Sequence, residues 1–309
     1  MNQNILKNIL NPTIFEENRL PAHSDHRVYA NKSELLKGNS SLIYPLNGVW
    51  KFDYSINPNC TPDGFEALDY DCKNWEDIRV PAHIQMEGYD RPHYANVAYP
   101  WDGRQALKSG EAPTDFNPVA SYVKYFTLPN GFIKDSLILR FEGVESAAAV
   151  WLNGHYIGYC EDSFTPSEFD LTEYIAEGEN KLAIQVAKWC SGSWLEDQDF
   201  FRFSGIYRSV YVDVLPKTRI NDFTVKTILD ESFTSAELKI EGLLQGKGRL
   251  VTELSYKGES QLTDESDISE KISPIVPNRF SYSLYRWLLF ISNAFSRYTI
   301  AFSLSFRKL

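Results

Sequence analysis

The stretch AAVWLNGHYIGYC (148–160) holds the clearest structural signal of the chain, two apolar runs on either side of Asn153–Gly154. An Asn–Gly pair favours the two-residue type I′ turn, because both central residues of that turn need a positive φ. The pattern therefore predicts a tight antiparallel β-hairpin near the middle of the sequence.

Short runs rich in Val, Ile, Tyr and Phe lie on both sides of this hairpin, with turn residues between them. These runs are LNGVWKFDY (46–54), SYVKYFTL (121–128), SLILRFEG (136–143), KLAIQVAKW (181–189) and YRSVYVDVL (207–215). One helix is predicted over SEFDLTEYI (167–175), where Asp170 and Glu173 have the spacing of a capping box. Because strand signals dominate, the sequence predicts an all-β fold.

A second β unit is predicted from Pro216 onward. Its strand candidates alternate apolar and polar residues, as half-exposed antiparallel strands do. They are FTVKTIL (223–229), SAELKIEG (235–242) and RLVTELSY (249–256). An immunoglobulin-like sandwich needs about seven strands, so residues 217–272 are predicted to form a partial one. The polar residues 1–45 are predicted to be an extended segment that wraps over the first domain, 46–216, or reaches a partner subunit.

The last part of the chain, residues 273–309, differs from the rest in composition. No Asp or Glu occurs in the 39 residues after Glu270, and aromatic and basic residues replace them. One interpretation is a membrane-surface or partner-binding tail. The other is sequence that is not native to the domain, from a shifted reading frame or a misjoined end. We favour the second, because the change is abrupt and falls inside a domain, and we expect this tail to be poorly ordered.

The overall charge and the cysteine content limit the classes of partner and the compartment. A net charge of −10 and a pI of about 5.1 disfavour nucleic acid and anionic membranes as partners. The N-terminus has no pattern of a signal peptide. The four cysteines show no zinc spacing, so a cytoplasmic protein with reduced thiols is expected, with Cys160 and Cys190 buried.

Two polar stretches interrupt the strand pattern. The first is VPAHIQMEGYDRPHYANVAYPW (80–101), and its length without periodicity is typical of a functional loop. The second is SGSWLEDQDFFRFSGIYR (191–208), which sets acidic residues among aromatic ones. Carboxylates accept hydrogen bonds from sugar hydroxyls while aromatic rings stack on the sugar face. The alternative is a surface acidic turn in which Arg202 is a structural ion-pair partner.

Six motifs resemble the N-terminal part of β-galactosidases of glycoside hydrolase family two, over about residues 11–260. They are NRLPAH (18–23), LNGVWKF (46–52), VPAHIQMEGYDRPHYANVAYP (80–100), FEGVESAAAVWLNGHYIGYCEDSFTPSEFDLT (141–172), GENKLAIQV (178–186) and GSWLEDQDFFRFSGIYRSV (192–210). The resemblance implies a jelly-roll sugar-binding domain followed by an immunoglobulin-like sandwich. In the family, a catalytic barrel comes next.

The resemblance also implies two substrate-binding residues. Asn96 matches the Asn that lines the family's substrate pocket, and Asp199 matches the Asp that contacts the galactosyl group and helps to hold a sodium ion. One carboxylate can serve both purposes, because it has several lone pairs and hard cations prefer oxygen ligands. Magnesium is expected only in the missing catalytic domain. Asn11 matches one position of a further magnesium site, but Ser191 stands where a carboxylate is usual, so no dependable magnesium site is expected here.

The function implied is that of the sugar-binding front part of a retaining β-galactosidase, which hydrolyses terminal non-reducing β-D-galactose residues such as that of lactose. Glycosidases use a pair of carboxyl groups, and those of the family have no counterpart here, so we predict no catalytic residue and no activity of the chain alone. The alternatives are a free-standing carbohydrate-binding module and a fragment that complements a catalytic portion or forms a homo-oligomer. A β-glucuronidase or β-mannosidase parent is less favoured, because the Asn96 and LEDQD motifs resemble the galactosidase branch.

Overall fold

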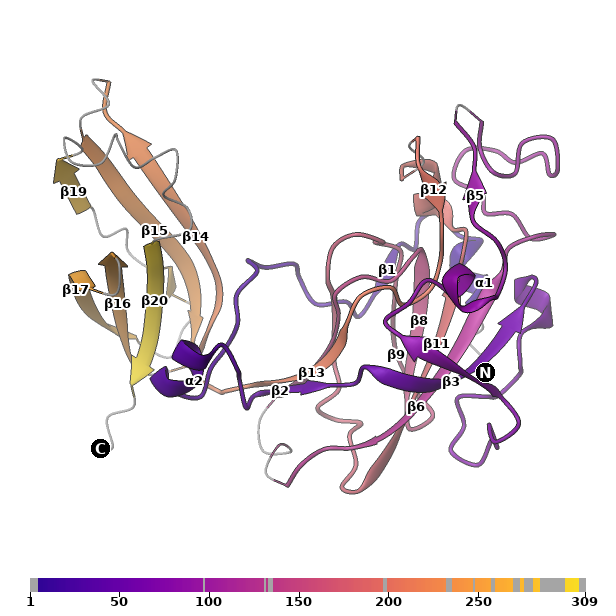
Figure 1. The fold of residues 1–309 in the computed structure, drawn as a ribbon, viewed down its shortest axis with the longest axis horizontal. Helices are drawn as coiled ribbons and strands as arrows, with labels where there is room; N and C mark the ends of the chain where they lie inside the picture. Colours follow the sequence, from indigo (N-terminus) through magenta and orange to yellow (C-terminus); the bar gives the residue numbers. More distant parts are fainter. Residues whose placement is uncertain are drawn as a thin grey trace. The chain divides into compact units, whose positions relative to one another are not determined.

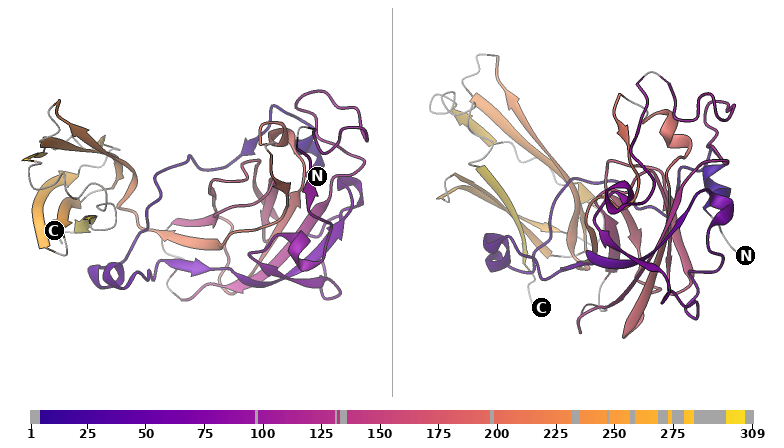
Figure 2. Two further views of the ribbon diagram at one scale, coloured as in Figure 1. Left: turned by 45° about the horizontal axis from the view of Figure 1, so that its top comes forward. Right: turned by 45° about the vertical axis from the view of Figure 1, so that its right-hand side comes forward.

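The computed structural model divides the chain into two compact units, which are described separately. The first comprises Met1–Ala22 and Arg27–Leu215, and the second His23–His26 and Pro216–Leu309. The structure describes residues 5–96, 98–130, 132, 136–196, 199–231, 235–246, 248–256, 259–268, 273–274, 280–283 and 298–305. In Figures 1 and 2 the strands of the second unit are drawn orange to yellow.

The first unit is built from two large antiparallel sheets and a separate two-stranded ribbon (Figure 1). The larger sheet has the order β1 (Glu16–Glu17), β9 (His155–Cys160), β8 (Ala147–Leu152), β11 (Glu179–Ala187), β6 (Val119–Thr127), β3 (Gly48–Ser55) and β4 (Glu76–Val80). The smaller has the order β10 (Ser167–Asp170), β7 (Ser136–Phe141), β13 (Val210–Leu215) and β2 (Ile43–Pro45). Strands dominate the described residues, which confirms the all-β prediction.

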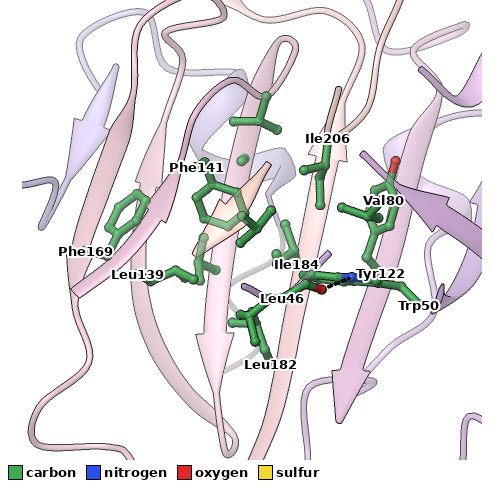
Figure 3. Packing of buried hydrophobic residues seen from close by; sticks show 14 of the residues in the cluster. Leu46, Trp50, Val80, Tyr122, Leu139, Phe141, Phe169, Leu182, Ile184 and Ile206 are labelled. Atoms are coloured by element: carbon green, nitrogen blue, oxygen red, sulfur yellow. Dashed lines mark hydrogen bonds between the residues drawn. The ribbon is translucent and has the colours of Figure 1, made fainter. Parts of the chain in front are cut away.

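A first apolar core takes its side chains from alternate positions of both sheets. Figure 3 shows members of this core, with Trp50, Tyr122 and Val80 from the larger sheet and Leu139, Phe141 and Phe169 from the smaller one. The Trp50 ring meets Tyr122 edge-on, and its Nε1 donates a hydrogen bond of 2.9 Å to the Leu46 carbonyl. The polar atom of this large side chain is thereby satisfied inside the core.

A second apolar core lies on the opposite face of the larger sheet. It contains Ala147, Ala149 and Trp151 of β8, together with Ile5 and Ile9 from around the helix α1 (Leu6–Ile9). Because both faces of β8 are covered, all six of its residues are buried. A strand buried on both faces reads as a continuous apolar run rather than an alternating one.

The predicted hairpin is confirmed. Asn153 and Gly154 have φ values of 52° and 83°, and Leu152 pairs with His155 across the turn. The register shifts between Val150 and Trp151, a bulge in the β8–β9 pair.

The helix predicted over 167–175 is wrong. Ser167–Asp170 forms β10, in which Phe169 is fully buried and pairs with Leu139 of β7. Asp170 accepts hydrogen bonds from the backbone N–H and the hydroxyl of Thr172, so its carboxylate closes a turn instead of capping a helix. Burial of the Phe169 ring therefore outweighs the local capping pattern.

A helix that the sequence analysis missed is α2 (Lys32–Lys37). The Asn31 side chain accepts from the Glu34 N–H at 3.0 Å, and the Glu34 carboxylate accepts from the Ala30 N–H at 3.2 Å. The helix ends at Gly38, which has a φ of 71°. Asn31 and Glu34 have the capping-box spacing, so the signal was present but lay in the stretch 1–45 that we predicted to be extended.

The second unit has two antiparallel sheets. One joins β14 (Arg219–Leu229), β15 (Ser235–Gln245), β18 (Ser273–Pro274) and β19 (Phe280–Ser283), and the other joins β17 (Glu259–Ile268), β16 (Gly248–Tyr256) and β20 (Tyr298–Ser305). The three predicted strands are present as β14, β15 and β16. Within 273–309 the described residues are those of β18, β19 and β20, and the rest of this tail lies outside the described residues. The domain limits and the expected poor order of the tail stay predictions.

The burial of the cysteines is a further expectation that the structure tests. Cys160 and Cys190 are fully buried, as predicted, and all four cysteines are free thiols. Among the described segments, no helix is long and apolar enough to cross a membrane.

Candidate functional site

The two polar stretches of the sequence meet in a short β-ribbon. It pairs β5 (His93–Tyr94) with β12 (Phe201–Arg202), and Tyr94 lies opposite Phe201 (Figure 1). Because side chains alternate along a strand, the Tyr94–Phe201 pair is exposed while Arg202 on the other face is only 4% exposed. The ribbon therefore exposes an aromatic pair to solvent on one face, and the buried Arg202 anchors it on the other face.

The two predicted substrate-binding residues are joined through Tyr94. The Tyr94 hydroxyl donates a hydrogen bond of 2.5 Å to Asp199 Oδ1 and accepts one of 3.3 Å from Asn96 Nδ2. All three side chains are exposed to solvent. Asn96 and Asp199 thus come from separate loops, 103 positions apart in the sequence, into one polar site.

Tyr94 is the site residue that the sequence analysis missed. The YAN motif contains it two positions before Asn96, and this spacing places two side chains of an extended segment on the same side. The contact of Tyr94 with Asp199 cannot be predicted from the sequence, because it depends on the pairing of β5 with β12. The hydrogen bond to Asp199 raises the pKa of Tyr94.

Acidic residues near Asp199 anchor the second loop. The Glu196 carboxylate accepts from the N–H and the hydroxyl of the buried Ser163, at 3.0 and 2.7 Å. Glu161 accepts from the Ser191 hydroxyl at 2.6 Å and from the Gly192 N–H at 2.9 Å. Glu196 and Glu161 therefore fasten the backbone of the loop, and Asp199 is the described acid of this loop that faces Tyr94.

Arg202 supports the same loop from its buried face. Its Nη1 donates to the backbone carbonyl of Glu196 at 2.9 Å, and its guanidinium lies 4.3 Å from the centre of the Phe200 ring. These contacts give Arg202 a structural role. Asp197 and Gln198, the other polar residues of the LEDQD motif, lie outside the described residues.

The first loop is fastened to the second by buried polar contacts. Gln85 donates to the Ser204 hydroxyl at 2.9 Å and accepts from the Ser204 N–H at 3.0 Å. It also donates to Asp90 at 3.0 Å, and Asp90 pairs with Lys188 at 2.5 Å. The Lys188 and Asp90 side chains are 1% and 4% exposed, so this ion pair is buried. These contacts tie together the loops that carry Asn96 and Asp199.

Glu145 and His83 are two further buried titratable groups near these loops. Burial, with a smaller effect of Glu196, raises the pKa of Glu145 to about 7. Burial lowers the pKa of His83, whose ring stacks on Tyr207 with centroids 5.0 Å apart. His83 Nδ1 lies 3.8 Å from Glu145 Oε2, but the lowered pKa of His83 keeps the imidazole mostly uncharged at neutral pH, so this contact is not an ion pair there.

Three positions, Asn11, Ser191 and Asp199, bear on metal binding. The Asn11 side chain accepts from Thr13, and the Ser191 hydroxyl donates to Glu161, so both are engaged locally. Within the described part of the chain, no cluster of three or more His, Cys, Asp or Glu residues is arranged to hold a metal ion. The sodium contact of Asp199 stays a prediction.

Comparison with protein families gives a match over most of the first unit. The family described as "Glycosyl hydrolases family 2, sugar binding domain" matches residues 43–216. A β-galactosidase of Halalkalibacterium halodurans is 53% identical over 227 residues, which are 73% of this chain and 22% of that protein. A β-galactosidase large subunit of Latilactobacillus sakei is 41% identical over 84% of this chain and 43% of its own length.

Solved structures show the same fold. A β-glucuronidase from Ruminococcus gnavus has a TM-score of 0.62 at 17% identity, over 93% of this chain and 45% of that one. A β-glucuronidase of Bacteroides uniformis has a TM-score of 0.57 at 20% identity, over 78% of this chain and 27% of that one. At this identity the likeness concerns the fold alone. The chain spans 22% and 43% of the lengths of the two β-galactosidase sequences above.

Proposed function

This chain belongs to glycosyl hydrolase family 2, and on that premise we propose that it is the N-terminal, sugar-contacting part of a β-galactosidase. The intact enzyme would hydrolyse terminal non-reducing β-D-galactose residues, such as that of lactose. The sequence relatives that support this specificity are β-galactosidases, at up to 53% identity. The β-glucuronidase structures are too distant in sequence to bear on it.

The observation that carries the proposal is the hydrogen-bonded group of Asn96, Tyr94 and Asp199. An amide offers both donors and an acceptor, and a carboxylate offers acceptors only. Together they match a sugar, whose hydroxyls donate and accept at once. The exposed rings of Tyr94 and Phe201, with centroids 5.4 Å apart, lie beside these groups and offer an apolar face for the sugar ring.

We also propose a sodium ion at Asp199. Its Oδ1 accepts one hydrogen bond from Tyr94, and the carboxylate keeps further lone pairs for a hard cation. The remaining oxygen ligands would come from the sugar and from the rest of the parent enzyme. Magnesium is assigned to the catalytic part of that enzyme.

A partner that supplies the catalytic carboxylates is part of the proposal. Relatives from Latilactobacillus sakei and Lactobacillus helveticus are named as large subunits of β-galactosidases. A chain of this kind, which contributes Asn96 and Asp199 from loops, would complete a site whose catalytic groups lie on another polypeptide or domain. On this proposal the chain alone has no galactosidase activity, and catalysis appears on assembly.

The test is a calorimetric titration of the purified chain with galactose, with and without sodium chloride at constant ionic strength. We expect saturable binding with a Kd of about 1 mM, typical of a small and exposed site, and tighter binding with sodium. Asp199→Asn is expected to weaken binding at least tenfold. The matched control is Asp71→Asn, which neutralises an exposed carboxylate before β4. Equal affinity in both variants would mean that Asp199 is not in the sugar site.

A mixing experiment distinguishes a fragment that complements a catalytic portion from a free-standing carbohydrate-binding module. The chain is combined with a β-galactosidase that lacks its own N-terminal region, and hydrolysis of a chromogenic β-galactoside is followed. A gain of activity that Asp199→Asn abolishes supports the complementing part. Galactose binding without any gain favours the free-standing module. Hydrolysis by the chain alone at the rate of a complete enzyme contradicts the proposal.

A further inference from the structure

We propose that Tyr94 is a positioning residue, which holds Asn96 and Asp199 in one fixed arrangement before any ligand arrives. The inference concerns the site described above and rests on the proposed function for its consequence in sugar binding. The arrangement itself is a property of the chain without ligand, so it is tested separately.

The phenol of Tyr94 uses its hydrogen-bonding capacity on its two neighbours. Its single hydrogen is directed to Asp199 Oδ1 at 2.5 Å, and one of its oxygen lone pairs receives Asn96 Nδ2 at 3.3 Å. The hydroxyl therefore has no second hydrogen to give to a ligand. Asn96 keeps one N–H and its carbonyl oxygen, and Asp199 keeps its remaining lone pairs. The hydroxyl of Tyr94 thus acts through its two neighbours, while the exposed ring can still contact the sugar.

Tyr94 is held by strand pairing, whereas its two neighbours are exposed loop residues. Tyr94 lies in β5, and its ring packs against Phe201, its cross-strand partner in β12. The other face of β12 is anchored by the buried Arg202, which donates to the Glu196 carbonyl. An exposed Asn or Asp otherwise samples several rotamers and loses that freedom on binding. A rigid phenol between them removes part of this cost and raises affinity through preorganisation.

The link between Tyr94 and Asp199 persists over the physiological pH range. The hydrogen bond to Asp199 raises the pKa of Tyr94, so the phenol remains protonated and remains a donor at neutral pH. Loss of the phenolic proton at high pH would leave Tyr94 unable to donate and would place two negative charges together.

The first experiment detects the arrangement without any sugar. In the full chain, the side-chain amide signals of Asn96 and the ring carbon Cζ of Tyr94 are followed by NMR. We expect Tyr94→Phe to shift the Asn96 amide signals and Asp199→Asn to lower the pKa of Tyr94. The control is Tyr174→Phe, which removes another exposed hydroxyl and should leave Asn96 unchanged. Unchanged Asn96 signals in Tyr94→Phe would overturn the inference.

The second experiment measures the consequence for binding. Phe keeps the ring that packs on Phe201, so the Tyr94→Phe chain should retain the melting temperature of the parent while its affinity for galactose falls about tenfold, or about 1.4 kcal/mol. If the parent binds galactose and Tyr94→Phe binds it equally well, the inference fails and the proposed function stands. If the parent binds no galactose, the proposed function fails for the isolated chain, and the NMR result alone decides the role of Tyr94.

Discussion

At the scale of single residues, Glu145 shows how far the fold displaces a side chain from its behaviour in water. Glu145 is 7% exposed, and burial raises its pKa to about 7. A raised pKa means that the folded state binds this proton more tightly than the unfolded state, whose Glu titrates near 4.5. As pH rises from about 4.5 to about 7, Glu145 loses its proton in the unfolded state while it keeps the proton in the folded state. The contribution of Glu145 to stability therefore falls as pH rises from about 4.5 to about 7, and is constant above that.

Glu145→Gln is expected to remove this pH-dependent loss of stability, because the amide stays neutral at every pH. Relative to the parent, the variant should gain on the order of 3 kcal/mol in the free energy of unfolding between pH 4.5 and pH 8, at about 1.4 kcal/mol per pH unit. Urea denaturation of both chains across this range measures the difference. Glu173→Gln, at an exposed position, is the control. A parent and variant whose difference in stability does not change with pH would contradict the assignment to Glu145.

The buried Asp90–Lys188 pair gives a second prediction at this scale. Burial lowers the pKa of Lys188 more than Asp90 raises it, so the ammonium depends on its partner. Asp90→Asn leaves a buried charge without its counter-ion and is expected to cost about 3–5 kcal/mol in the free energy of unfolding. Chemical denaturation at pH 7 measures this. The exposed pair of Lys73 and Asp71 is the comparison, since Asp71→Asn should cost less than about 1 kcal/mol.

At the scale of elements, Gly158 of β9 allows the neighbouring strand β1 to pack closely against it. A Cβ at Gly158 would lie 2.5 Å from the Glu17 carbonyl oxygen and 2.7 Å from the Phe169 ring. Glu17 belongs to β1, which pairs with β9 at the edge of the larger sheet. The missing side chain thus allows β1 to dock from one side and the Phe169 ring to pack from the other.

Gly158→Ala is expected to displace β1 and to cost about 1–3 kcal/mol, the usual penalty of overpacking. Hydrogen exchange should become faster at residues 15–20. The amides of β11 are the internal control, because this strand is paired on both sides, with β6 and β8. Unchanged protection of residues 15–20 in the variant would show that β1 tolerates the added methyl group.

At the scale of the whole molecule, the first unit has apolar cores of its own. Both buried clusters consist of residues up to Val214, all in the first unit. Among the second-unit residues whose burial is described, Ile240, Leu244 and Leu250 are buried apolar side chains. The two clusters give the first unit the apolar burial that a separate fold requires.

A chain that ends at residue 216 is expected to fold cooperatively. Its melting temperature should lie within about 5 °C of the main transition of the full chain, a shift that corresponds to about 1–2 kcal/mol for a domain of this size. Circular dichroism in the near ultraviolet during heating measures it. A truncated chain without a cooperative transition would show that the second unit is required for the first to fold.

The sequence by itself determined the class of the fold and the family. The Asn153–Gly154 turn and the apolar runs are local signals, because a type I′ turn or a buried strand depends on the residues within it. The long motifs around Asn96 and Asp199 identified two members of the candidate site for a similar reason, since each motif is read as one continuous stretch.

Only the tertiary structure decided what depends on residues far apart in the chain. The pairing of β5 with β12 makes Tyr94 the link between Asn96 and Asp199. The packing of Phe169 makes 167–170 a strand, although the capping pattern at Asp170 favoured a helix. The burial of Glu145 raises its pKa, which no neighbour in sequence explains. In each case the deciding energy, whether a hydrogen bond, apolar burial or desolvation, arises between segments that are brought together only by folding.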